Sequence, residues 1–321
     1  MSPFAESSAG RVAALGEVAL LERIRSWLGD AMPPAPEGMG DDCAVLSRPA
    51  GNLFAADSLL YARHFDDTAA PVRAGAKLLL RNLSDIAAMG GEPRYAVMSA
   101  FLPPATSLAW LEHFCRGLAD CAGQYATALV GGDITESSEG PGFSLAITGY
   151  AARPLLRSGG QPGDRLYVTG ALGGSLRGRH LDFVPRLAEG RWLAARPDVR
   201  ACIDITDGLG KDLNALLRDG LGASLDTAAV PLSRAAHDIA GESGESAFWH
   251  ACNDGEDYEL LFTLDGATDP VGFERAWSNA VDTPLARIGN IRARAADEAA
   301  VIDAASGKPV GNLSGYTHLG A

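Results

Sequence analysis

The sequence predicts a mixed α/β protein built from two consecutive halves. Its 321 residues are enough for two domains with sizeable cores. Helical periodicity alternates with short apolar runs of strand length, and this alternation favours mixed α/β structure. A stretch rich in Pro and Gly, residues 153–163, interrupts the alternation. We therefore expect one domain over residues 1–152 and a second over residues 153–321.

The first half is expected to begin with an amphipathic helix over Val18–Leu28, which prolines at positions 33, 34 and 36 bring to an end. Pro71 is a favourable first-turn residue and Gly90-Gly91 stops a helix, so a long helix is predicted over Pro71–Met89. A further helix is predicted over Leu108–Ala122. Strands are predicted over Cys43–Leu46, Leu53–Ala56, Tyr95–Leu102, Leu129–Val130 and Phe143–Tyr150.

The second half is expected to open with a strand over Asp164–Thr169 and to continue the alternation. Another of its strands is predicted over Tyr258–Leu264. Both halves therefore combine helices with strands, which is the basis for the mixed α/β prediction.

Charge and cysteine content limit the class of partner and compartment. A formal net charge of -13 argues against binding nucleic acid or an anionic membrane surface, and it suits a protein that binds cations. The chain has 5 cysteines and no Cys-x-x-Cys pair, which is typical of a reducing cytoplasm. The N-terminus lacks the pattern of a signal peptide, and no apolar run has the length of a membrane span. We expect a cytoplasmic protein.

Aspartates beside glycines and apolar residues are the most informative pattern. Acidic residues usually lie on solvated faces, so carboxylates at the ends of apolar strands need an explanation. A single aspartate of this kind is more often a turn or a helix cap. Here the pattern recurs five times, at Gly40-Asp41-Asp42, Ala55-Ala56-Asp57, Asn82-Leu83-Ser84-Asp85, Gly131-Gly132-Asp133 and Asp204-Ile205-Thr206-Asp207-Gly208.

Such a set of carboxylates predicts a hard metal ion that holds a polyphosphate. Buried carboxylates repel one another unless a cation lies among them, and oxygen ligands select ions such as Mg²⁺. Calcium is the main rival, but no EF-hand loop is present. Gly131-Gly132 and the segment 170–175 can bring backbone N–H groups close to phosphate oxygens, although the latter also fits a plain strand-to-helix turn. P-loop, protein-kinase and zinc motifs are absent from the sequence.

Read in order, the Gly/Asp sites belong to a longer series of blocks. The blocks are Gly-Asp-Asp-Cys-Ala, Asp57 with His64-Phe65, Asn-Leu-Ser-Asp-Ile-Ala-Ala-Met-Gly, Gly-Gly-Asp-Ile-Thr, Arg157-Ser158-Gly159, Ile-Asp-Ile-Thr-Asp-Gly-Leu, Gly-Glu-Asp-Tyr-Glu-Leu and Gly315-Tyr316-Thr317-His318. The identity and order of these blocks resemble the thiamine-monophosphate kinase family. The resemblance runs from about residue 16 to the C-terminus. The Asn-Leu-Ser-Asp and Gly-Glu-Asp-Tyr-Glu-Leu blocks are the specific ones, because short Gly/Asp blocks occur throughout the wider aminoimidazole-ribotide-synthetase-like superfamily.

The resemblance implies a fold, an assembly and a reaction. The fold would be the two-domain aminoimidazole-ribotide-synthetase-like α/β fold with mixed sheets. The assembly would be a homodimer in which the N-terminal sheets form a barrel. The reaction would transfer the γ-phosphoryl group of ATP directly to thiamine monophosphate, giving thiamine diphosphate and ADP. Catalysis would then consist mainly of positioning and of charge neutralisation by several Mg²⁺ ions.

The resemblance also implies roles for individual residues. The expected metal ligands are Asp42, Asp57, Asp85, Asp133, Asp204 and Asp207. Of these, Asp42, Asp133 and Asp207 are expected to be catalytic. The expected ATP contacts are Gly132, Asp133, Arg157 and Thr206, and the expected thiamine-phosphate contacts are His64, Glu256 and Tyr316. On pattern alone, His64 also fits a packed histidine, Glu256 the start of a strand, and Tyr316 a tail residue docked on the core.

Three departures from the family pattern stand out. Ala55 and Ala56 occupy positions where the family commonly has a hydroxyl pair that helps to bind metal. Asp254 replaces a glycine and adds negative charge near the expected substrate site, and Thr206 replaces a serine. None of these changes removes a core carboxylate.

Two alternatives stay open at this point. The first is a sibling enzyme of the superfamily, such as aminoimidazole-ribotide synthetase, selenophosphate synthetase or the hydrogenase-maturation member. The last two depend on reactive sulfur or selenium, whereas this chain has no cysteine in an N-terminal glycine-rich segment or at its C-terminus. The second alternative is a non-catalytic nucleotide-binding sensor, for which the Ala55-Ala56 pair is the only support.

Overall fold

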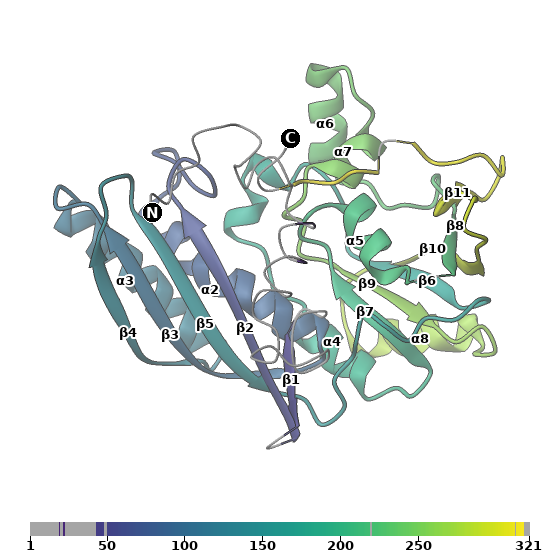
Figure 1. The fold of residues 1–321 in the computed structure, drawn as a ribbon, viewed down its shortest axis with the longest axis horizontal. Coiled ribbons are helices and arrows are strands. Elements are labelled where there is room, and N and C mark those ends of the chain that lie inside the picture. Colours follow the sequence, from purple (N-terminus) through teal and green to yellow (C-terminus); the bar gives the residue numbers. More distant parts are fainter. Residues whose placement is uncertain are drawn as a thin grey trace.

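The structure is a computed structural model that describes residues 19, 22, 43–47, 50–218, 220–311 and 313–317. The predicted helix Val18–Leu28 falls almost entirely outside these residues, and so does the predicted metal ligand Asp42. The described chain forms two sheets that follow one another in the sequence, with helices packed on both (Figure 1). The mixed α/β prediction is confirmed.

The first sheet has the strand order β1-β2-β5-β3-β4. Its strands are β1 (Ala44–Ser47), β2 (Ala50–Leu60), β3 (Glu92–Leu102), β4 (Ala128–Glu136) and β5 (Gly142–Tyr150). Neighbouring strands are antiparallel except β3 and β4, which are parallel and are joined through a helix. In Figure 1, β4 is the edge strand farthest from the second half.

Strands β2 and β4 are longer than their sequence predicts. Both were expected to end at their Gly/Asp blocks, but Asp57 and Gly131–Asp133 lie within the strands. Glycine weakens a strand signal, so the pattern appeared to stop there. Gly132 is needed for the pairing itself, because a Cβ atom at this position would lie 1.9 Å from the Met98 carbonyl oxygen of β3.

Two helices cover one face of the first sheet, α2 (Pro71–Ala88) and α3 (Leu108–Gln124). They cross closely at glycines, since a Cβ atom on Gly75 would lie 1.9 Å from the Phe114 carbonyl oxygen. Beneath them, the rings of Phe114 and Phe143 stack with centroids 4.0 Å apart. The opposite face, called here the open face, exposes the large apolar side chains Phe54, Tyr95, Val97 and Phe101.

The second sheet has the strand order β11-β8-β10-β6-β9-β7. Its strands are β6 (Arg165–Thr169), β7 (Val199–Asp204), β8 (Leu221–Leu225), β9 (Leu260–Leu264), β10 (Leu285–Ala293) and β11 (Val301–Asp303). Alternate residues of its central strands enter two different cores, as Tyr167 and Val168 do.

Helices therefore cover both faces of the second sheet. One core includes residues of α4 (Leu187–Ala194) and α8 (Pro270–Ala280), and the other includes residues of α5 (Leu209–Leu216) and α7 (Ala247–Asn253). The remaining helical elements are η4 (Ser175–Arg177), η5 (Arg179–Leu181) and α6 (Arg234–Ser243).

The two halves share their cores. Tyr258 of the second half belongs to the core beneath α2, and Ala88 of α2 belongs to the core that holds α4 and α8. Helices α2 and α4 meet backbone to backbone, because a Cβ atom on Gly190 would lie 2.0 Å from the Ala87 carbonyl oxygen. The cleft between the halves thus has walls fixed by close packing.

The cysteines and the helices also bear on the expectations from the sequence for disulfides and membrane spans. All five cysteines lie in the described residues and none forms a disulfide; Cys115 on α3 is exposed, whereas the other four are buried. Among the described residues, no helix combines the length and apolar character that crossing a bilayer requires.

Candidate active site

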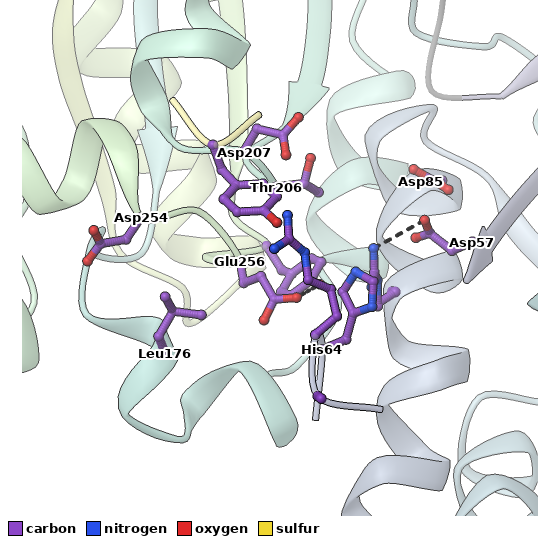
Figure 2. A pocket seen from close by; sticks show the side chains of 13 residues that line it. Asp57, His64, Asp85, Leu176, Thr206, Asp207, Asp254 and Glu256 are labelled. Atoms are coloured by element: carbon purple, nitrogen blue, oxygen red, sulfur yellow. Dashed lines mark hydrogen bonds and ion pairs between the residues drawn. The ribbon is translucent and has the colours of Figure 1, made fainter. Parts of the chain in front are cut away.

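Most of the predicted site residues line one cavity between the two halves. The cavity has a volume of about 490 Å³, which suits a small-molecule ligand. Figure 2 shows that Asp57, Asp85 and His64 come from the first half, whereas Thr206, Asp207 and Glu256 come from the second. The predicted residues that line it are Asp57, His64, Asp85, Thr206, Asp207, Glu256 and Tyr316.

Strand β2 and helix α2 fix the carboxylate of Asp57. The Asp57 backbone N–H donates to Asn82 Oδ1 over 3.2 Å, and Asn82 in turn donates to the Leu78 carbonyl over 2.9 Å. Arg81 Nη2 lies 3.3 Å from Asp57 Oδ1. Asn82 is fully buried, so it positions β2 against α2, while Asp85 one turn along α2 faces the cavity.

His64 lies in a tight loop that follows β2. Ala62 has a φ of 60°, a left-handed conformation that lets the chain turn back on itself. The Leu60 backbone N–H donates to His64 Nδ1 over 3.0 Å. An accepting Nδ1 places the proton of the neutral imidazole on Nε2.

Glu256 lies in a second loop with an unusual backbone. Gly255, Glu256 and Tyr258 all have positive φ values, of 76°, 57° and 53°. Such a run is unfavourable for side chains other than glycine and needs support from its surroundings. Hydrogen bonds from Glu256 N to the Thr206 carbonyl, 2.7 Å, and from Tyr258 N to the Ile205 carbonyl, 2.8 Å, supply that support.

The Glu256 carboxylate belongs to a buried charge cluster. Glu256 Oε2 lies 2.7 Å from Lys77 Nζ and 2.9 Å from His180 Nδ1. Burial alone would raise the pKa of Glu256, but the His180 hydrogen bond and the Lys77 ammonium outweigh it and lower the pKa to about 2. Burial lowers the pKa of Lys77 to about 8, although Glu256 opposes that shift. The same ammonium donates to the His64 carbonyl over 2.9 Å, so Lys77 joins both site loops.

The loop between β7 and α5 carries Thr206 and Asp207. Their backbone N–H groups donate to Asp212 Oδ2 over 2.9 and 3.0 Å. Burial, together with the nearby Asp207 charge, raises the pKa of Asp212 to about 8. Because both donors use Oδ2, Oδ1 is left able to carry the proton. The Asp207 carboxylate itself pairs with Lys211 Nζ at 2.8 Å.

Tyr316 closes the cavity near the C-terminus. Its backbone N–H donates to the Asp207 carbonyl over 2.8 Å, which fixes this part of the tail to the β7–α5 loop. The Arg63 guanidinium lies 5.0 Å from the centroid of the Tyr316 ring, a cation–π geometry. The ring therefore already presents a face to a positive charge.

Four predicted residues within the described chain lie elsewhere. Asp204 is 2% exposed and accepts a 2.5 Å hydrogen bond from Ser84, so it connects α2 with β7 beside the cavity. Arg157 is half-buried and acts electrostatically on Asp212. Gly132 and Asp133 lie on β4, where Thr135 Oγ1 donates to Asp133 over 3.2 Å. Within one chain, Asp133 and the cavity are on different parts of the first sheet.

Sequence reasoning missed two basic residues at the site, Arg81 in the cavity lining and the fully buried Lys77, which contacts Glu256 of the lining. Lys77, Arg81 and Asp85 follow one another at intervals of four along α2, so they share a helix face. That spacing, in a helix otherwise rich in Leu and Ala, was an available signal. The contribution of His180 had no such signal, because its partner Lys77 is 103 positions away.

The carboxylates that line the cavity suit a magnesium ion that also binds substrate phosphates. Among the described residues, no three His, Cys, Asp or Glu side chains already converge on one point. Asp57, Asp85 and Asp207 nevertheless line one cavity and offer only oxygen donors there. Mg²⁺ commonly uses one or two carboxylates together with water and substrate phosphates, so this donor set fits it.

Comparison with known proteins defines the class. Residues 40–151 match the family described as AIR synthase related protein, N-terminal domain. The two-sheet fold and this match place the protein among the AIR-synthase-related α/β proteins.

Three relatives narrow the assignment. The chain is 34% identical to the thiamine-monophosphate kinase of Rhodopirellula baltica, with 82% of this chain and 85% of the relative covered. It is 35% identical to that of Escherichia coli (strain K12), with 78% and 83% covered. A solved structure described as AaThiL complexed with AMPPCP and TMP superposes with a TM-score of 0.82 at 28% identity, covering 97% of this chain and all of that one. The chain belongs to the thiamine-monophosphate kinase family.

Proposed function

We propose that the chain transfers the γ-phosphoryl group of ATP to thiamine monophosphate, giving thiamine diphosphate and ADP. The observation that carries this function is family membership over most of the chain, at 34% identity. The structure described as AaThiL with AMPPCP and TMP supports ATP and thiamine monophosphate as the two ligands. The relatives named as thiamine-monophosphate kinases favour this reaction over that of a sibling enzyme of the superfamily.

The roles of the cavity residues follow from their chemistry. Thiamine monophosphate carries a cationic aromatic ring, for which the Tyr316 face and the ionised Glu256 are suitable partners. His64 would contact the same ligand, and Thr206 would contact ATP through its hydroxyl or backbone. Arg157, whose charge acts on Asp212 behind the β7–α5 loop, would contact ATP at the edge of the cavity.

Mg²⁺ would be held by Asp57, Asp85 and Asp207 together with the nucleotide phosphates, and by Asp42, Asp204 and Asp133 as the resemblance implies. When bound, the ions neutralise the charge of the transferring phosphoryl group. The protein's own part is to orient the two substrates in a cleft of fixed width and to keep Glu256 ionised.

The active assembly would be a homodimer that covers the open face of the first sheet. Phe54, Tyr95, Val97 and Phe101 are 44%, 54%, 43% and 41% exposed there. Several large apolar side chains exposed on one face of a sheet favour a protein interface. Burying it against a second copy gives a symmetric interface, which is the commonest arrangement in soluble oligomers.

The same dimer would complete the site with Asp133. Among the described residues, β1 pairs with β2 only as far as Phe54, so no described strand flanks residues 55–60 of β2 on that side, where the Asp57 N–H instead donates to Asn82. Strand β4 is the free edge on the other side of the sheet. Closing a barrel joins such edges, and β4 of the partner would then run beside Asp57. Gly132 of the partner subunit and Asp133 of the partner subunit would thereby reach the cavity.

Domain boundaries and compartment are also proposals. We assign the first domain to residues 1–152 and the second to 153–321, because β5 ends at Tyr150 and β6 begins at Arg165. We assign the protein to the cytoplasm, because five free thiols suit a reducing compartment.

The deciding experiment follows product formation by chromatography with purified protein, ATP, Mg²⁺ and thiamine monophosphate. Thiamine diphosphate and ADP should appear in equal amounts, and both should disappear when the metal is chelated. Nucleotide binding without any thiamine diphosphate would refute the proposal and favour the non-catalytic sensor.

A further inference from the structure

Arg81 occupies a central place in the cavity that no predicted role explains. It lies on α2, and its side chain is 12% exposed. Arg81 Nη1 donates to the Ser58 carbonyl over 2.9 Å, and Nη2 lies 3.3 Å from Asp57 Oδ1. Its Nε is buried without a hydrogen-bond partner among the described residues. A guanidinium has five donors, so this one is held in place but not saturated.

The neighbours of Arg81 along α2 define its position in the cleft. One turn earlier, Lys77 contacts the His64 carbonyl and the Glu256 carboxylate, at the end assigned to the thiamine cation. One turn later, Asp85 lines the cavity beside Asp57, at the end assigned to the metal and nucleotide. Four residues advance an α-helix by about 6 Å. Arg81 therefore lies between the organic cation and the metal.

The charged groups that line the cavity indicate which ligand group binds at this position. The described lining of the cavity includes the carboxylates of Asp57, Asp85, Asp207, Asp254 and Glu256 and the guanidinium groups of Arg63 and Arg81. Arg63 lies over the Tyr316 ring, so Arg81 is the guanidinium fixed beside the metal carboxylates. An acceptor phosphate that enters so acidic a site needs a fixed cation, and a guanidinium matches phosphate oxygens in geometry as well as in charge.

We propose that Arg81 binds the phosphate group of thiamine monophosphate and holds it between the thiamine contacts and the metal. The inference rests on the proposed function, because the thiamine and metal ends of the cleft are defined by it. Asp57 and the Ser58 carbonyl orient the guanidinium, and the second N–H group of each Nη atom binds the phosphate. Arg81 is thus a binding residue for the phosphoryl acceptor.

The test compares thiamine monophosphate with thiamine, which lacks the phosphate. Both ligands are titrated by calorimetry, with Mg²⁺ and without ATP, into the wild type, Arg81→Met, Arg81→Lys and the control Arg116→Met. Arg116 pairs with Glu112 on the exposed surface of α3, away from the cavity. Arg81→Met should weaken thiamine monophosphate binding by about tenfold or more and leave thiamine binding unchanged, as expected for the loss of charge-assisted hydrogen bonds. Arg81→Lys should show a smaller loss, and Arg116→Met none.

Thiamine binding by each variant serves as the check on its fold. If Arg81→Met keeps the wild-type ratio of the two affinities, the proposal is wrong. If Arg81→Met does not fold, the test rests on Arg81→Lys, which keeps the positive charge and loses the paired N–H groups of the guanidinium. A wild-type ratio of the two affinities in Arg81→Lys also overturns the proposal. The proposal is also wrong if the wild type binds thiamine and thiamine monophosphate with equal affinity. Failure of the proposed function would instead appear as absence of thiamine diphosphate in the wild-type assay, whatever the ratio.

Discussion

At the scale of single residues, the neighbours of Glu256 determine its charge state. Lys77 and His180 keep this half-buried carboxylate ionised, with a pKa of about 2 against an ordinary 4.5. A carboxyl group whose pKa falls on folding contributes stability that is present above the unfolded pKa and is lost as pH falls towards the folded pKa. The relevant window is therefore pH 4.5 down to 2.

The first prediction concerns Glu256→Gln. Above pH 4.5 the variant should be less stable than the wild type, because Lys77 loses its buried partner. The difference should shrink as the pH falls from 4.5 towards 2, where the wild-type carboxylate also becomes neutral. Urea unfolding at several pH values measures it. A difference that is constant over this range would show that Glu256 is not held ionised by its neighbours.

The second prediction concerns Asp133→Asn. Removal of one charge with little change in volume should abolish phosphoryl transfer and leave the fold intact, since Asp133 is exposed on β4 within a single chain. Turnover and the thermal midpoint are measured on the same preparation. Turnover like that of the wild type would remove Asp133 from the site.

At the scale of elements, α2 organises the cleft. Its inward face packs on the first sheet through residues such as Leu79 and Leu83, and one edge presents Lys77, Arg81 and Asp85 in sequence. The fully buried Lys77 connects the His64 loop to the Glu256 loop, although the latter lies 179 positions further along the chain. A single helix thus sets the positions of residues from both halves.

The third prediction follows from that connection. Lys77→Met should lower the free energy of unfolding by about 3 kcal/mol, because it leaves the half-buried Glu256 carboxylate without its ammonium partner. Denaturant unfolding near pH 7 measures the change. Lys308→Met, at an exposed position, is the control and should change stability by less than about 0.5 kcal/mol. Equal stability of Lys77→Met and the wild type would contradict the role of Lys77.

At the scale of the whole molecule, one chain presents an incomplete set of the predicted site residues. The cavity gathers the carboxylates of β2, α2 and the β7–α5 loop, whereas Asp133 lies on the far edge strand of the first sheet. Large apolar side chains exposed on the open face accompany this separation, and within the described residues no strand pairs with the outer side of β4 or with residues 55–60 of β2 opposite β5. The proposed homodimer would account for these features together.

The fourth prediction tests the interface. Val97→Lys places a charge in the centre of the open face and should convert the dimer to a monomer, as measured by light scattering after size-exclusion chromatography. Leu108→Lys is the matched control, because Leu108 is 84% exposed at the start of α3. A dimeric Val97→Lys variant would place the interface elsewhere.

The fifth prediction tests whether sites are shared. Asp133→Asn and Asp207→Asn should each be inactive alone. If Asp133 serves the partner's cavity, an equal mixture that exchanges subunits freely should recover about one quarter of wild-type activity, because half the dimers are mixed and each has one intact site. Absence of any recovery after verified exchange would place both residues in the same chain's site.

The fold class and much of the site could be predicted from the sequence. Helix α2 was predictable because Pro71 and Gly90 mark its ends, and the family was predictable because its Gly/Asp blocks survive in order. Strand β4 was underestimated because it is exposed along its whole length and therefore lacks the alternation that marks a half-buried strand. Site roles stay predictions, and none of the patterns pointed to the contacts of Lys77 or Arg81, which form only when distant segments fold together.

Compounds designed to bind the cleft would encounter two halves of the chain whose relative position is fixed by a backbone contact. Helices α2 and α4 touch at Gly190 and Ala87, where even a methyl group would force them apart. A molecule that tethers a thiamine-like cation to a phosphate mimic would therefore bind a preorganised slot and lose little affinity to reshaping the enzyme. The linker length that gives the highest affinity is then set by the protein. A short series of compounds that differ only in this length should show one sharp maximum of affinity.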